Sequence, residues 1–141
     1  MINGLSYNQL AFECHQNNAK WWHDLETGER LDRDKDELLM LVLSELAEAM
    51  EGERKGLMDD KLPHRPMAEV ELVDGAIRIG DFAGAFGYDI QPGGYSLEPL
   101  PDNKAAGLFD ISKMVVELGH LCYNDGDHFP EIRKQIGQQI Y

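Results

Sequence analysis

Apolar residues recur at steps of three and four along most of this chain, and few stretches alternate apolar and polar residues with a period of two. The segment 105–123, for example, carries Leu108, Ile111, Val115 and Leu118 at such steps. A period near 3.6 residues is that of one face of an α-helix, whereas a half-buried strand needs a period of two. The pattern therefore predicts an all-α fold, an antiparallel helical bundle of about five helices.

Capping residues and helix breakers predict where these helices end. Ser6 with Gln9, and Asp34 with Glu37, have the spacing of capping boxes at helix N-termini. The four longer helices are expected over about residues 7–23, 35–51, 66–87 and 105–123, and a short last helix begins at Pro130. Residues 88–104 are rich in Pro and Gly and are expected to be irregular.

The size and charge of the chain limit what it can bind. Its 141 residues suit one domain spanning residues 1–141, long enough to bury a core. With 13 Lys and Arg against 26 Asp and Glu, the net charge is −13. Binding to nucleic acid or to an anionic membrane surface needs a basic face, so we expect neither partner. An acidic protein can still bind a phosphorylated small molecule if cations lie between the two.

The sequence also bears on localisation. The first residues contain no basic segment followed by an apolar stretch, so no signal peptide is expected. The longest apolar run, Leu38–Leu43, has six residues, whereas a membrane-spanning helix needs about 20. Cys14 and Cys122 belong to no CxxC pair, which favours reduced thiols. We therefore expect a cytoplasmic protein.

Two of the expected helices are mostly apolar but carry acidic residues three apart. Glu45 and Glu48 lie in one, and Glu71 and Asp74 lie in the next. Carboxylates on buried helices repel one another and resist desolvation, so they need cations or water. Antiparallel packing could bring all four together, and such oxygen donors suit Mg²⁺ or Mn²⁺. The alternative is a pair of solvated acidic faces, which a chain this acidic can contain by chance.

The sequence around these acids resembles that of the MazG-like all-α nucleoside triphosphate pyrophosphohydrolases. Glu45-x-x-Glu48, followed after 22 residues by Glu71-x-x-Asp74, is similar to the ExxE…ExxD signature of that family. The flanking SELAEAMEGERKG and EVELVDGAIRIGDFAGAFGYDI extend the likeness, which covers about residues 7–91. The resemblance implies that the four carboxylates bind metal in a helical enzyme, usually an oligomer and here a homodimer or homotetramer. Such an enzyme hydrolyses a nucleoside triphosphate to the monophosphate and pyrophosphate with Mg²⁺.

The chemistry of that reaction agrees with an acidic site. Attack of water on the α-phosphorus needs neutralised phosphate charge and a deprotonated nucleophile, and Mg²⁺, or Mn²⁺ in its place, supplies both. A carboxylate that is not fully engaged with metal can accept the water proton, and Glu48 is our candidate for this base. Residues 92–141 diverge from the family pattern. Relatives often have Lys and Asn four residues apart on the last core helix, whereas here Glu117 follows Lys113 at that spacing.

Other residues are candidates for contacts with the substrate. Trp22 could stack on the base, and Asn18 and His15 lie one and two turns before it. The alternatives are that Trp22 is a core residue and that the other two are ordinary surface residues.

Lys55, beside the link between the acidic helices, and Lys113 could contact phosphates, or could simply be solvated. Arg78 and Asp81 continue the acidic line of their helix. They could form a pair that orients metal ligands and substrate, or a structural salt bridge.

Glycines within the helix expected at 66–87 predict the close approach of another helix. Gly75, Gly80 and Gly84 each cost about 1 kcal/mol relative to Ala in a helix interior, so their presence needs a reason. The partner helix could belong to the same chain or to a second subunit, and we expect a subunit interface at this face.

Three functions are consistent with the sequence. The first is a (d)NTP pyrophosphohydrolase, and the second is a phosphoribosyl-ATP pyrophosphohydrolase-type enzyme of the same superfamily. The third is a non-catalytic helical oligomer that binds nucleotide or metal, which the missing Asn at Glu117 leaves open.

Overall fold

The computed structural model describes residues 4–91, 99–123 and 130–141, and the regular elements of these residues are all helical. In chain order they are α1 (Tyr7–Asn17), the 3₁₀ turn η1 (Ala19–Trp22), α2 (Lys35–Lys55), α3 (Met67–Phe86), α4 (Lys104–Tyr123) and α5 (Pro130–Ile140). Within the described ranges β-pairing is limited to two isolated bridges. The predicted all-α class with five helices is therefore confirmed.

The ends of the helices follow the capping residues closely. Ser6 and Gln9 form the predicted capping box, with N–H···O distances of 3.2 and 2.8 Å. The side chain of Asp34 accepts a hydrogen bond from the backbone N–H of Glu37 at the start of α2. Gly87, with a φ of 66°, ends α3 in the left-handed conformation that glycine adopts without strain. The Asn-Asp-Gly sequence at residues 124–126 predicts a turn after the helix expected at 105–123, but it lies outside the described residues.

Two boundaries differ from the prediction. The first α-helix ends at Asn17, and the chain continues through η1, so the helix expected over 7–23 is shorter. Helix α2 runs to Lys55, four residues beyond its predicted end. It passes through Gly52 because this glycine packs against the start of α3, and it ends at Gly56, which has a φ of 62°.

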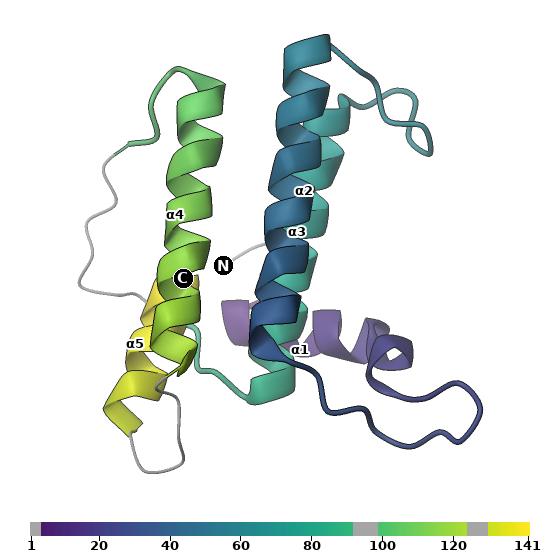
Figure 1. The fold of residues 1–141 in the computed structure, drawn as a ribbon, viewed down its shortest axis with the longest axis vertical. Helices are drawn as coiled ribbons and strands as arrows, with labels where there is room; N and C mark the ends of the chain where they lie inside the picture. Colours follow the sequence, from purple (N-terminus) through teal and green to yellow (C-terminus); the bar gives the residue numbers. More distant parts are fainter. Residues whose placement is uncertain (1–3, 92–98, 124–129) are drawn as a thin grey trace.

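Helices α2 and α3 form the centre of the molecule. Gly52, near the end of α2, faces Met67 and Ala68 at the start of α3, and Gly75 farther along α3 faces Glu45. The two helices therefore run in opposite directions and lie side by side along their lengths (Figure 1). This pairing places residues near the middle of α2 opposite residues near the middle of α3.

Helix α1 lies across α3 near the end of α3 (Figure 1). A Cβ atom on Gly84 would lie 2.5 Å from the carbonyl oxygen of Ala11, and one on Gly80 would lie 3.0 Å from Sγ of Cys14. These glycines thus permit the close approach of a helix of the same chain. The expectation that they mark a subunit interface is wrong, because α1 occupies that face.

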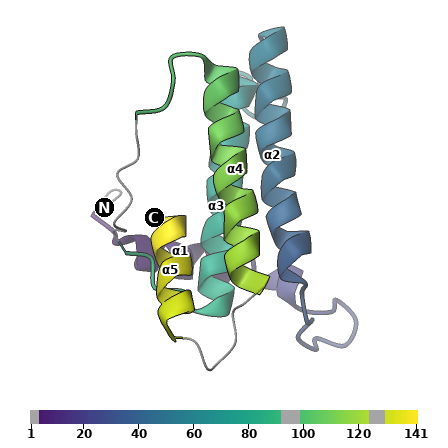
Figure 2. The same ribbon diagram turned by 60° about the vertical axis from the view of Figure 1, so that its left-hand side comes forward.

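Helix α4 packs on α2, and α5 packs on α4 and on the end of α3 (Figure 2). Apolar side chains from these helices fill one continuous core, among them Leu39, Val42, Leu46, Phe82, Leu118 and Ile136. Within the described part of the chain, each helix is too short or too polar to cross a membrane.

Candidate metal centre

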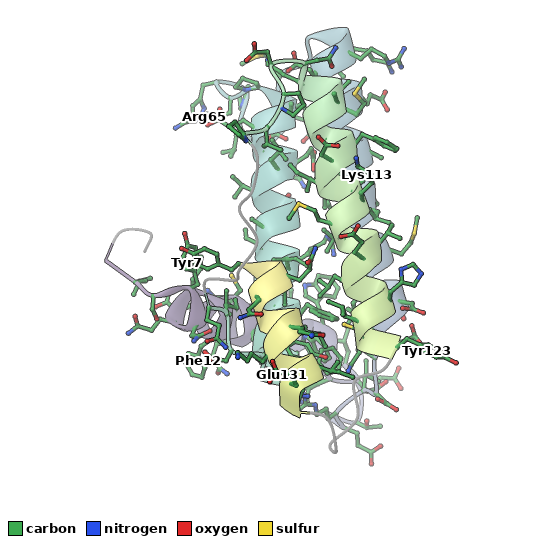
Figure 3. All side chains as sticks on the ribbon, turned by 90° about the vertical axis from the view of Figure 1, so that its left-hand side faces the viewer. Tyr7, Phe12, Arg65, Lys113, Tyr123 and Glu131 are labelled. Atoms are coloured by element: carbon green, nitrogen blue, oxygen red, sulfur yellow. The ribbon has the colours of Figure 1, made fainter. Side chains whose placement is uncertain are left out.

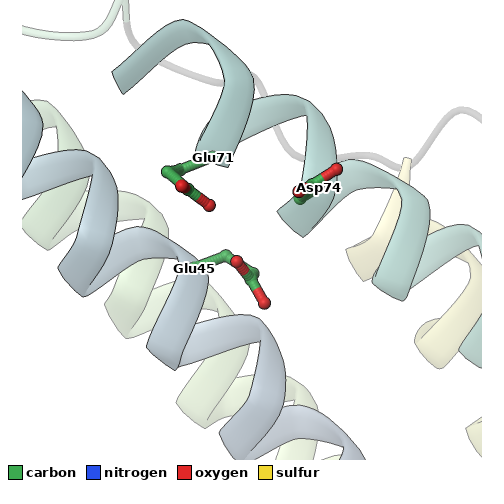
Figure 4. Close-up of side chains that lie close together, drawn as sticks. All are labelled: Glu45, Glu71 and Asp74. Carbon is green, nitrogen blue, oxygen red and sulfur yellow. The ribbon is translucent and has the colours of Figure 1, made fainter. Parts of the chain in front are cut away.

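Three of the four predicted metal ligands meet between α2 and α3. One carboxylate oxygen from each of Glu45, Glu71 and Asp74 lies within 4.8 Å of the others. Figure 4 shows Glu45 on α2 and Glu71 on α3 facing each other, with Asp74 on the next turn of α3. They meet because the antiparallel pairing puts Gly75, which has no side chain, next to Glu45.

The donor set fits a small hard cation. Carboxylate oxygens are the preferred protein ligands of Mg²⁺ and Mn²⁺, and three of them leave coordination positions for water and phosphate oxygens. Glu48 is exposed on α2 and is not part of the group of three, but its charge acts on Glu71. This places the candidate base beside the metal ligands.

The neighbouring acids perturb Glu71. Burial raises the pKa of Glu71 to about 7, together with a hydrogen bond from its carboxyl group to Glu45 and the negative charges of Glu48, Glu45 and Asp74. With this pKa, Glu71 is partly protonated near neutral pH, because burial and the neighbouring negative charges disfavour its ionised form. A cation bound between the acids would relieve this repulsion.

Arg78 brings one positive charge to the acidic group. Its Nε–H donates to Oε1 of Glu45 at 2.5 Å, across the interface from α3 to α2. Glu45 is almost fully buried, with 8% of its side chain exposed, whereas 41% of the Arg78 side chain is exposed. The prediction that Arg78 pairs with Asp81 is wrong, because Arg78 reaches across to the facing helix.

A pocket of about 420 Å³ opens beside the acidic group. Its walls come from α2, α3 and the chain between α1 and α2. They are formed by Asn18, Trp21, Arg33, Leu38, Leu41, Asp74, Ile77, Arg78 and Asp81. Asp74 belongs both to the acidic group and to the pocket wall. A ligand in the pocket would therefore lie next to a cation held by the three carboxylates.

Asp81 anchors the N-terminal segment to α3. The indole N–H of Trp22 donates to its two carboxylate oxygens at 2.9 and 3.1 Å, and Nδ1 of His15 lies 2.8 Å from Oδ1. Trp22 has only 3% of its surface exposed. Trp22 is therefore a core residue and not an exposed stacking platform for the base. His15 contacts Asp81, a residue of the pocket wall, and is not itself part of that wall.

Apart from its aliphatic residues, the pocket wall has two residues that sequence reasoning missed. Trp21 is 59% exposed and is the tryptophan that lines the cavity, next to the predicted Asn18. Arg33 lines it as well, and its guanidinium donates to the backbone oxygen of Trp21 at 3.0 Å and to Glu37 at 2.8 Å. The sequence does not show which of the two adjacent tryptophans faces the pocket, because the backbone path of the turn η1 decides this.

The two predicted lysines lie on other surfaces. Lys55 pairs with Glu51 at the end of α2, ten residues and thus about 15 Å along the helix from Glu45. Lys113 lies on α4, pairs with Asp110 at 2.6 Å and covers the ring of Phe109 (Figure 3). Neither residue lines the pocket, so the candidate phosphate contacts become Arg33 and Arg78.

Comparison of the chain with protein-family models, with curated proteins and with solved structures returned no match.

Proposed function

We propose that this chain is a Mg²⁺-dependent nucleoside triphosphate pyrophosphohydrolase of the MazG-like type, which converts a (d)NTP and water to the (d)NMP and pyrophosphate. The observation that supports this most is the meeting of Glu45, Glu71 and Asp74 beside a pocket whose wall includes Asp74. The same pocket carries two arginines, and Arg is well suited to bind phosphate groups. An acidic cation site beside a pocket wall that carries two arginines suits a metal-bound polyphosphate.

Each residue then has a separate task. When bound, Mg²⁺ or Mn²⁺ would neutralise phosphate charge and lower the pKa of the attacking water. Glu45, Glu71 and Asp74 would hold the cation, and Glu48, which is exposed beside them, would accept the proton from water. Arg33 and Arg78 would contact phosphate oxygens on the pocket wall.

The proposal is tested by pyrophosphate release with Mg²⁺ and with Mn²⁺ across the common ribo- and deoxyribonucleotides and phosphoribosyl-ATP. We expect turnover of at least one nucleoside triphosphate, which chelator abolishes. Turnover of phosphoribosyl-ATP alone would indicate the second enzyme class. Thermal stabilisation by nucleotide without turnover would indicate a binding protein instead.

Asp74→Asn tests whether the acidic group carries the activity. Removing a charged ligand from the cation should lower kcat/KM for pyrophosphate release by at least about a hundredfold. Glu69→Gln is the matched control, because Glu69 is an exposed acid of the same helix that pairs with Arg65. We expect its kcat/KM to stay within about twofold of the wild-type value, since this surface ion pair contributes little. Full activity in Asp74→Asn would refute the assignment of the site.

A further inference from the structure

We propose that Arg78 exchanges partners: it binds Glu45 when the acidic group holds no cation, and it binds a phosphate group in the pocket once a divalent cation has taken its place. This inference rests on the proposed function. It identifies the residue that couples cation binding to binding of the phosphorylated ligand.

The first step is competition for one carboxylate. The Nε–H of Arg78 donates to Oε1 of Glu45 at 2.5 Å, and Glu45 is also one of the three acids whose oxygens converge. Because the Glu45 side chain is only 8% exposed, few directions of approach remain open to it. A divalent cation among the three acids would stand next to the guanidinium, and two adjacent positive charges repel each other.

The second step is the movement of the displaced Arg78 side chain into the pocket. Arg78 is 41% exposed and lines the pocket together with Arg33, so its guanidinium can turn toward the cavity without crossing the core. Of the two acids near it on α3, Asp74 would hold the cation, and Asp81 is already engaged by Trp22 and His15. A guanidinium has five N–H donors in a planar fork that matches phosphate oxygens. A phosphate group in the pocket is therefore the partner that suits it best.

The consequence is a coupling between the two ligands. Without a cation, Arg78 is paired with Glu45, and the other arginine of the pocket wall, Arg33, is paired with Glu37. With a cation bound, Arg78 becomes available, so binding of phosphate should strengthen. Because coupling of two binding equilibria is reciprocal, the phosphate ligand should strengthen cation binding by the same factor.

The test uses Arg78→Gln with two probes, Mn²⁺ alone and inorganic pyrophosphate at saturating Mg²⁺. Loss of the competing guanidinium should tighten Mn²⁺ binding by about tenfold. Loss of its charged hydrogen bonds should weaken pyrophosphate binding by about tenfold or more. Arg65→Gln is the matched control, because it removes the same charge from an exposed residue. Arg65 lies just before α3 and pairs with Glu69 in the first turn of that helix (Figure 3). Neither affinity should change there by more than about twofold.

The outcomes separate this inference from the proposed function. A wild-type protein that binds no Mn²⁺ refutes the proposed metal centre itself. If the wild type binds Mn²⁺ but Arg78→Gln leaves either affinity equal to that of Arg65→Gln, the metal centre stands and the exchange is wrong. Weaker Mn²⁺ binding in Arg78→Gln also overturns the exchange, because it would mean that Arg78 supports the metal site.

A measurement on the unmodified protein does not depend on the folding of a variant. The Nε–H of an arginine gives its own signal in ¹H–¹⁵N spectra, and a short bond to a carboxylate shifts that signal downfield. For Arg78 we expect the downfield shift without metal, its loss on addition of Mg²⁺, and a further change on addition of pyrophosphate. A signal that Mg²⁺ leaves in place would overturn the exchange.

Discussion

Single residues show both what the sequence indicates about this site and where it falls short. The sequence identified three acids that meet in the structure, Glu45, Glu71 and Asp74. They stand out because carboxylates on apolar helices cost free energy unless something binds them. The sequence did not identify the partner of Arg78, because Asp81 on the same helix and Glu45 on the facing helix are equally plausible partners for an ion pair. Only the packing of α3 on α2 decides between them.

Glu71 makes the stability of the metal-free protein depend on pH. Its folded-state pKa of about 7 lies above the ordinary value of 4.5. Between these values the folded state binds more protons than the unfolded state, so stability falls as pH rises from about 4.5 to about 7. In Glu71→Gln this loss is absent. At pH 8 in chelator, the variant should gain on the order of 1 kcal/mol over wild type, a figure reduced for the partial exposure of the site.

Urea denaturation from pH 4 to pH 8 measures this effect. The difference between Glu71→Gln and wild type should vanish near pH 4, where the carboxyl group is protonated in both states. Glu69→Gln should show no comparable gain at pH 8, because Glu69 pairs with Arg65 at the surface. A pH-independent difference for Glu71→Gln would show that Glu71 ionises freely in the folded protein.

At the scale of the helices, the sequence was informative where side chains act locally. The capping box at Ser6 and the left-handed glycine at Gly87 act within a few residues, so both ends were predictable. The end of α2 was not, because Gly52 is a contact with α3 and not a helix stop. The partner of Gly84 was also hidden, since spacing along α3 does not show that α1 crosses it.

The crossing of α1 over α3 predicts a large cost for a methyl group at Gly84. In Gly84→Ala the new Cβ would lie 2.5 Å from the backbone oxygen of Ala11, so the helices must separate. We expect a loss of about 2 kcal/mol or more in the free energy of unfolding, measured by urea denaturation. Gly107→Ala is the control, because its nearest neighbours are 4.0 Å away and Ala favours the helix. Equal stability of Gly84→Ala and wild type would refute this packing.

At the scale of the whole molecule, α3 has apolar residues on its outer face. Leu72, Val73 and Ile77 are 40%, 54% and 39% exposed. Ile77 also belongs to the pocket wall, so this face is continuous with the candidate site. We propose that a second copy of the chain covers it, which gives the homodimer or homotetramer expected from the sequence.

Sedimentation velocity over a range of concentrations tests this assembly. We expect an oligomer at micromolar concentration, and Val73→Ser should weaken association by about tenfold or more because each copy loses buried apolar surface. Leu25→Ser is the control, because Leu25 is 89% exposed and lies outside the helices. A wild-type protein that stays monomeric at all concentrations would contradict the proposal.

The most direct test of the account is the anomalous scattering of a crystal soaked in Mn²⁺. The account predicts a strong peak between α2 and α3, with oxygen atoms of Glu45, Glu71 and Asp74 at about 2.1 Å from it. A peak elsewhere, or none between these carboxylates at saturating Mn²⁺, would contradict it.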